Sequence, residues 1–298
     1  MRVTSNMLSE NMVRQIQDLS SRQSKLQTQV STGQRIFQPE DDAPAVGRVL
    51  ALESEQRALA QFKRNVDRAL ELSQATFGGI KQLKLISDRA GEIATLGTGA
   101  LNADSNTAYA SEVDQLIEQA LQFSNTRFRN DYVFAGTAVD APPFVATRDS
   151  SGAITSVAYA GNTSRATVQL SESAGIQPGS SAATNAGLGD FLNHLVSLRD
   201  ALRANDNTAI AAAQSGLVNS EDLLVSSLAE HGGVQTRIES NRSQLLDREQ
   251  SLEQLVSAET DADLPSTIVR LNQSQTAYQA ALQSAASIMR ISLLDYIK

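Results

Sequence analysis

Both ends of the chain carry a narrow apolar stripe with the spacing of an α-helix that packs against another helix. The N-terminal stripe, whose members are separated alternately by four and three residues, consists of Met12, Ile16, Leu19, Leu26 and Val30, with Gln23 in the same row. The C-terminal stripe has the same spacing and consists of Leu264, Ile268, Leu271, Tyr278, Leu282 and Met289, with Gln275 and Ala285 in the row. A chain that begins and ends with such helices is predicted to pair its ends or to present them to other copies. This favours assembly over catalysis.

The composition favours thin helical bundles over one large round core. Of the 298 residues only 4% are aromatic, and there is no Trp and no Cys, so disulfides and thiolate metal sites are excluded. The formal net charge is −8 without a basic cluster, which argues against nucleic acid as a partner. The sequence contains no run of 18 apolar residues, so no membrane span is predicted. Residues 1–7 lack the apolar core of a secretory signal, so any export is expected to use another route.

A loop is predicted between the first stripe and the next helix. Gly33 is a typical helix C-terminus, and residues 34–44 contain two prolines and the acidic cluster at residues 40–42. We expect this cluster to cap the following helix and to pair with Arg35. A cation site at the same carboxylates is the less favoured alternative.

A helix of about fifty residues, 45–94, is predicted next, with a possible bend at Gly78–Gly79. A turn over 95–106 and a helix over 109–125 follow. The period then changes to short alternating runs, which predict strands over 144–147, 154–159 and 165–170.

Helical spacing returns at Asp190, with stripes over 191–202 and 210–224 and a second long stripe over 234–255 that follows Gly232–Gly233. A break at residues 261–265 precedes the terminal helix. The predicted fold class is therefore mainly α with a small β insertion, an elongated helical bundle or coiled coil of paired N- and C-terminal segments. The predicted domains are terminal assembly segments 1–40 and 262–298, a helical domain formed by 41–136 and 187–261, and an outer β-rich insertion, 137–186.

No grouping of residues predicts an enzyme, a cofactor site or a metal site. His194 and His231 have no Cys companions, and the carboxylates of Asp261 and Asp263 are expected to begin the last helix. The glycine pairs at 97–99 and 187–189 are expected to be turns rather than phosphate loops. The triplet 162–164 matches a glycosylation sequon, which is weak evidence by itself.

The sequence resembles the flagellin superfamily of bacteria, and within it the hook-associated junction proteins. The resemblance rests on three fragments in order: Ser31-Thr-Gly-Gln-Arg-Ile-Phe-Gln-Pro-Glu-Asp-Asp42, Asp131-Tyr-Val-Phe-Ala-Gly136, and the ending from Tyr278 to Lys298. The family-like positions of the first fragment are Gly33, Arg35, Ile36, Asp41 and Asp42. Together the fragments extend over the whole chain, although the insertion is short for the family.

This resemblance implies a flagellin-like fold and a structural subunit between hook and filament, outside the cell and transiently cytoplasmic before export by the flagellar type III system. It implies as partners other copies, neighbouring hook-associated protein on the hook side and on the filament side, and an export chaperone at the C-terminal segment. The alternatives are flagellin itself, the filament subunit, and a soluble coiled-coil signalling protein. We also expect both terminal helices to be largely disordered in a single copy, because short helices with one narrow apolar stripe are marginal in water.

Overall fold

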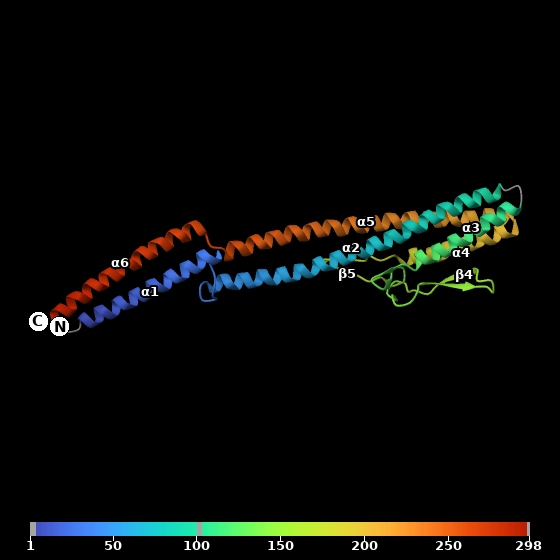
Figure 1. Cartoon of the computed structure of the whole chain (residues 1–298). Coiled ribbons are helices and arrows are strands. Elements are labelled where there is room, and N and C mark those ends of the chain that lie inside the picture. The colour runs from blue at the N-terminus through green and yellow to red at the C-terminus, as the bar shows by residue number, and fades with distance from the viewer. Residues whose placement is uncertain (1–3, 100–102, 297–298) are drawn as a thin grey trace. The chain divides into compact units, whose positions relative to one another are not determined.

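The computed structural model describes residues 4–99 and 103–296, with side-chain surroundings between residues 10 and 287. Helices account for 73% of the 298 residues, which confirms the predicted fold class (Figure 1). The helices of the described part are α1 (Thr4–Thr32), α2 (Ala43–Thr98), α3 (Ala103–Ser124), α4 (Ala182–Ala204), α5 (Asn207–Thr260) and α6 (Leu264–Tyr296). Its strands are β1 (Arg127–Phe128), β2 (Asp131–Tyr132), β3 (Phe144–Arg148), β4 (Ile154–Tyr159), β5 (Val168–Gln169) and β6 (Gly175–Ile176).

The chain forms two compact units. Unit 1 contains Met1–Ala58 and Arg248–Lys298, and unit 2 contains Leu59–Asp247. The long helices α2 and α5 contribute residues to both units, whereas α1 and α6 belong only to unit 1.

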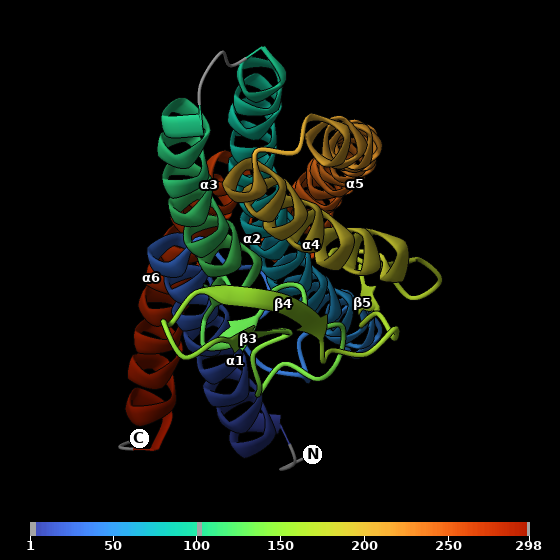
Figure 2. The same ribbon diagram turned by 90° about the vertical axis from the view of Figure 1, so that its right-hand side faces the viewer.

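In unit 1, α1 and α6 lie side by side, as both views show (Figure 1, Figure 2). The pairing joins the first and last helices, as the matching apolar stripes predict. The unit also holds two ion pairs between α2 and α5, Arg48 with Glu259 and Arg248 with Glu55.

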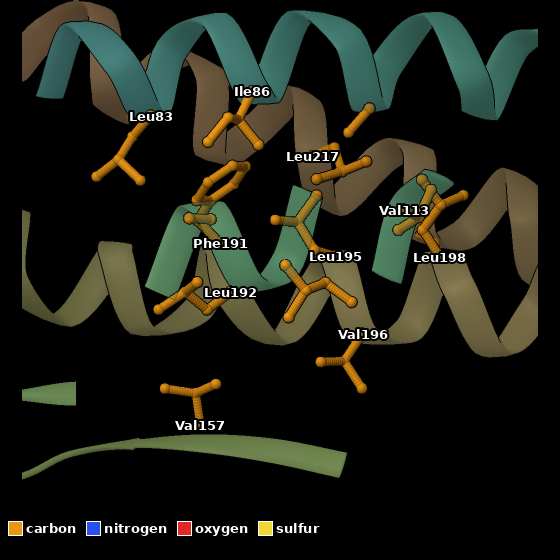
Figure 3. Close-up of a cluster of buried hydrophobic side chains, with 14 of the residues drawn as sticks. Leu83, Ile86, Val113, Val157, Phe191, Leu192, Leu195, Val196, Leu198 and Leu217 are labelled. Atoms are coloured by element: carbon orange, nitrogen blue, oxygen red, sulfur yellow. The ribbon is translucent and has the colours of Figure 1, made fainter. Parts of the chain in front are cut away.

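Unit 2 has a continuous apolar core between α2, α3, α4 and α5. Phe191, Leu195 and Leu198 of α4 are fully buried. Figure 3 shows Leu83 and Ile86 of α2 and Leu217 of α5 above the same α4 side chains. On the opposite side of α4, Leu192 and Val196 face Val157 of β4, so this helix is covered on both sides (Figure 3).

The strands form three separate antiparallel pairs, β1–β2, β3–β4 and β5–β6. The β3–β4 hairpin lies across α3 and α4 (Figure 2). Asn193 of α4 binds the backbone of β4 twice: its side chain accepts from the Val157 N–H and donates to the Val157 carbonyl, both at 2.9 Å. The guanidinium of Arg199, 3% exposed, donates to the Ile154 carbonyl at 2.6 Å and to Asp114 at 3.0 Å.

The start of α4 differs from the prediction. The helix begins at Ala182, with Ser181 as its N-cap, so the segment 187–189 is helical and not a turn. The reason is close helix packing: a Cβ atom at Gly187 would lie 2.5 Å from the Leu223 side chain of α5. Glycine here allows two helices to approach, a role that sequence spacing does not distinguish from a turn.

Other boundaries also shift. α5 is one helix from Asn207, because it continues through Gly232–Gly233. α2 is one helix through Gly78–Gly79, as predicted, but it ends at Thr98, within the segment 95–106 that was predicted to be a turn. The strand predicted over 165–170 contains only the two residues of β5, and its partner β6 was not predicted. The strands predicted over 144–147 and 154–159 match β3 and β4 within one residue.

Candidate functional site: the paired helix breaks

Two interruptions of the helical chain meet within unit 1. One is the loop 33–42 between α1 and α2, and the other is the segment 261–263 between α5 and α6. The Arg35 N–H donates to the Thr260 carbonyl at 2.6 Å, and the Ala262 N–H donates to the Gly33 carbonyl at 2.8 Å. These bonds form an antiparallel bridge of one residue pair, Gln34 with Asp261. The two breaks are thus one structural feature, which we call the paired helix breaks.

Gly33 ends α1 in the way the sequence predicts. Its φ is +72°, in the left-handed region that L side chains rarely adopt, and its N–H donates to the Gln29 carbonyl at 2.9 Å. The chain therefore turns out of α1 at this residue and reaches the bridge one residue later.

Arg35 joins three parts of the paired helix breaks. Its guanidinium donates to the Asp42 carboxylate at 2.8 Å and to the Glu259 carbonyl at 2.7 Å, near the end of α5. Its own carbonyl accepts from the Gln29 side chain of α1 at 2.9 Å. The predicted ion pair with the acidic cluster is present, and it extends to a helix about two hundred residues further along the chain.

The two aspartates of the loop have different partners. Asp42 accepts from the Ala45 N–H at 3.1 Å and so caps α2, and the hydrogen bond from Arg35 lowers its pKa. Asp41 accepts from Lys25 of α1 at 2.6 Å and from the N–H groups of residues 37 and 38 at 2.9 and 3.0 Å. The Lys25 contact is the main cause that lowers the pKa of Asp41 far below its usual range. Both carboxylates are therefore occupied by donors of this chain.

Sequence reasoning missed Arg48 and Glu259. Two nitrogens of Arg48 donate to the two carboxylate oxygens of Glu259 at 2.8 Å each, and this hydrogen bond lowers the pKa of Glu259. The pair joins α2 to α5 beside the bridge. The mirror positions of the two breaks in the sequence were a signal that the breaks could meet. Spacing along the chain does not tell which charged residues near the two breaks will form a pair.

The predicted stripe of α1 is its less exposed face. Met12, Ile16, Leu19, Leu26 and Val30 are all half-buried, and Gln23 shares this state, whereas most side chains between them are exposed. None of the described side chains of α1 is fully buried. Ile36 of the loop is half-buried, and Phe37, next to it, is 59% exposed.

The predicted stripe of α6 is only half correct. Leu271, Tyr278 and Ala285 face inward as predicted, but the row beside them is displaced by one residue. The more covered residues are Thr267, Ser274 and Ala281, in place of Ile268, Gln275 and Leu282. We attribute the displacement to size, because a row of small side chains lets a neighbouring helix approach more closely. The side chain of Met289 lies outside the described part.

As a consequence, α6 carries an uncovered apolar row. Leu264, Ile268 and Leu282 are 41%, 44% and 43% exposed, and Val269 next to the row is 54% exposed. We call the first three the outer row of α6.

The remaining candidates from the sequence have structural roles. Asp263 begins α6 as expected: its carbonyl accepts the first helical bond from the Thr267 N–H at 2.9 Å, and its carboxylate accepts from the Ser266 N–H at 3.5 Å. The Asp261 carboxylate does not begin α6 but accepts from hydroxyls at the end of α5. The Asn162 side chain of the sequon accepts from the Thr137 N–H and donates to the Thr137 hydroxyl, so its amide is engaged. His194 contacts the Ser220 hydroxyl at 2.9 Å. Within the described residues, no cluster of three or more metal-ligating His, Cys, Asp or Glu side chains occurs, and no helix has the length and apolarity that a membrane crossing requires.

Sequence comparisons find a relative that aligns over the whole chain and others that align over part of it. Residues 3–139 match the model of the bacterial flagellin N-terminal helical region. The chain is 26% identical to flagellar hook-associated protein 3 of Escherichia coli strain K12, in an alignment of 317 residues that covers 100% of each chain. It is 27% identical to the protein of the same name from Salmonella typhimurium, over 48% of this chain and 46% of the relative. The resemblance predicted from three fragments is thus confirmed.

Solved structures agree on the fold. A protein described as a flagellar hook-associated protein from Vibrio parahaemolyticus superposes with a TM-score of 0.66 at 17% identity, over 74% of this chain and 100% of its own. FlgL of Bacillus cereus superposes with a TM-score of 0.61 at 16% identity, over 70% of this chain and 99% of its own. The flagellin-like fold is therefore shared with these proteins.

Proposed function

We propose that this chain, similar along its full length to flagellar hook-associated protein 3, is a structural subunit of the bacterial flagellum that joins hook to filament. The observation that carries the proposal is the full-length match. This match includes both terminal helices and the two breaks that separate these helices from the rest of the chain. The fold supports the same role, since it resembles that of solved hook-associated proteins. The role is mechanical and requires no catalytic step.

We further propose that the terminal helices are the assembly surfaces. The outer row of α6 has no cover within one copy, although Leu264, Ile268 and Leu282 recur on one side of the helix. Burying the part of each side chain that is still exposed would contribute about 1 kcal/mol. The inner face of α6 already contacts α1, so the outer row is free to pack against neighbouring subunits, whether copies of this chain or other hook-associated proteins.

The proposed domains follow from this division of roles. Residues 1–40 and 262–298 are the assembly segments, 41–136 and 187–261 form the helical domain, and 137–186 is the outer insertion. We also propose an extracellular location after export by the flagellar type III system, with a chaperone at the C-terminal segment before export. These steps rest on the resemblance alone.

Deletion of the gene tests the main role. We expect hooks without filaments by electron microscopy, with unassembled flagellin in the medium, and restoration of filaments by the full-length chain. Normal filaments on the deletion strain would contradict the proposal.

A second pair of variants tests the assembly surface. The double variant Ile268→Ser/Leu282→Ser should fail to restore filaments, whereas Gln273→Ser/Ala280→Ser, on another exposed side of α6, should restore them.

Because the chain has no Cys, Ile268→Cys introduces a single thiol that should react with maleimide in the monomer and be protected in assembled flagella. Thr155→Cys, on exposed β4, serves as the matched control that should react in both states. Equal labelling of Ile268→Cys in both states would exclude the outer row as an interface.

A filament subunit remains the alternative function. It is favoured by the flagellin match at residues 3–139 and by 29% identity over 97 residues to a flagellar filament 41 kDa core protein of Borreliella burgdorferi, which covers 32% of this chain. The purified chain should then polymerise alone into long filaments. A junction subunit should form no such filaments under the same conditions.

A further inference from the structure

A histidine without a hydrogen-bond partner is buried in the helical core of unit 2. His231, on α5, is 0% exposed, and neither its Nδ1 nor its Nε2 atom has a partner among the described residues. A neutral imidazole tolerates such a place at a moderate cost, because only one N–H is left unsatisfied. An imidazolium would carry two unsatisfied N–H groups and an uncompensated charge, which is far more costly.

The turns of α5 on either side of His231 contact α4 and α2. One turn earlier on α5, the Ser227 hydroxyl lies 3.0 Å from that of Thr184 on α4. One turn later, Gln235 donates to the backbone carbonyl of Ser73 on α2 at 3.3 Å. Ser73 is itself 0% exposed, and its hydroxyl has no partner among the described residues. Around the level of His231, α5 thus contacts both α4 and α2, and we call this level the layer of His231.

The charged groups near this layer compensate each other. Glu230, next to His231 on α5, lies 3.3 Å from Arg165, which comes from the segment before β5. α2 has no titratable side chain between Glu71 and Lys81, and α4 has none before Asp190. Among the described residues, the one carboxylate that favours a positive charge on the imidazole, that of Glu230, is thus opposed by the charge of Arg165.

We propose that His231 makes the helix packing of unit 2 sensitive to acid: the layer accepts the neutral imidazole, and protonation loosens the contacts of α5 with α2 and α4. Mild acid would then weaken unit 2 itself, independently of the contacts between subunits. The inference concerns this core and holds for either function considered above.

The direction of the pH dependence follows from burial. Burial lowers the pKa of His231, and the effects of Glu230, which raises it, and of Arg165, which lowers it, are smaller. The unfolded chain, with an ordinary histidine pKa near 6.5, then binds a proton that the folded chain does not. Above about pH 6.5 the neutral His231 costs the folded state no stability relative to the unfolded chain. Below that value the folding equilibrium constant falls about tenfold per pH unit, until the pH reaches the lowered pKa of the folded state.

The first test measures the wild-type protein, because the chain has only two histidines and a single variant assigns their signals. The ring C–H signals of the full-length protein, followed by NMR between pH 7.5 and 5, should show that His231 in folded molecules stays neutral below the ordinary histidine pKa of about 6.5. The second ring signal belongs to the partly exposed His194 and is identified by its absence from the spectrum of His194→Asn. A His231 signal that titrates in the folded protein with a midpoint at or above pH 6.5 would overturn the proposal.

The second test compares unfolding of the full-length chain at pH 7.5 and 5. The folding equilibrium constant should fall up to about thirtyfold more in the wild type than in His231→Phe, which fills the layer with a ring that cannot be protonated. His194→Asn should keep the wild-type acid sensitivity. Equal acid sensitivity of wild type and His231→Phe would refute the role of His231, and if this variant does not fold, the NMR titration alone decides.

Discussion

Helix α4 of unit 2 and helix α1 of unit 1 have similar lengths and very different degrees of cover. α4 has 23 residues, of which thirteen are buried, including Phe191 and Leu195. α1 has 29 residues, and none of its described side chains is fully buried. Both carry apolar residues at helical spacing, so spacing tells that a helix has a partner face but not how completely that face is covered.

The difference separates a core that one copy can complete from a surface that needs neighbours. Unit 2 encloses a continuous apolar cluster among its own helices, so one copy completes this core, although side chains such as Leu85 and Val218 stay exposed. The α1–α6 pair leaves its apolar side chains half-buried and the outer row of α6 uncovered. The disorder of both terminal helices in a single copy stays a prediction.

Amide exchange should show the largest contrast between the two regions. In the monomer, amides of residues 4–30 and 270–296 should exchange almost as fast as in an unfolded chain, because their opening costs little free energy. Core amides around Leu195 should open only with global unfolding, at a cost of about 5 kcal/mol or more. Assembly should protect the terminal amides. Strong protection of both ends in the monomer would show that the α1–α6 pair is self-sufficient.

The same substitution in both helices gives the next contrast. Leu195→Ala should lower the free energy of unfolding by about 3–5 kcal/mol, because Leu195 is fully buried and leaves a cavity. Leu19→Ala in α1 should change the unfolding of the monomer by less than about 1 kcal/mol, since Leu19 is half-buried on a helix that is marginal alone. Chemical denaturation followed by circular dichroism measures both. Equal losses would remove the distinction between the regions.

Element types were more predictable than the contacts between them. Periodicity identified the long helices and the β3–β4 hairpin, because these signals are local. It failed at Gly187, where a glycine serves helix packing, and at Ile268 and Leu282, where two adjacent rows of α6 compete to face α1. In both places the outcome depends on the size of side chains on another helix, which spacing within one helix does not contain.

The candidate site shows the same limit. Gly33, Arg35 and Asp42 were predicted with roles close to those observed, since capping, turning and a short-range ion pair are local. Glu259 and Arg48 were missed, because their contact joins helices that are far apart in sequence. A loop motif thus predicts its own geometry but not the helix to which it is bound.

Removing the Arg35 side chain should separate the paired helix breaks. Arg35→Ala loses donors to Asp42 and to the Glu259 carbonyl, for an expected cost of about 1–2 kcal/mol, reduced by solvent exposure. The loss of these hydrogen bonds should appear as faster exchange of the backbone amides of residues 35 and 262, which form the bridge. Arg35→Lys should restore protection only in part, because an ammonium lacks the planar fork of a guanidinium. Arg14→Ala, on exposed α1, is the control, and unchanged bridge amides in Arg35→Ala would show that the backbone bridge holds alone.

Acid should open the loop between α1 and α2 at Asp41. This is the smallest effect that we expect. Because the folded-state pKa of Asp41 is lowered, its contribution is present above the unfolded pKa of about 3.9 and is lost as the pH falls below it. The amides of Phe37 and Gln38, which donate to this carboxylate, report the change directly. In the wild type their protection should decrease between pH 5 and pH 3, after correction for the intrinsic exchange rate, whereas in Asp41→Asn it should be low throughout and independent of pH. Glu40→Gln changes a neighbouring exposed carboxyl and should behave as the wild type does, so a matching loss in this variant at pH 5 would assign the effect to the charge of the loop and not to the bonds of Asp41.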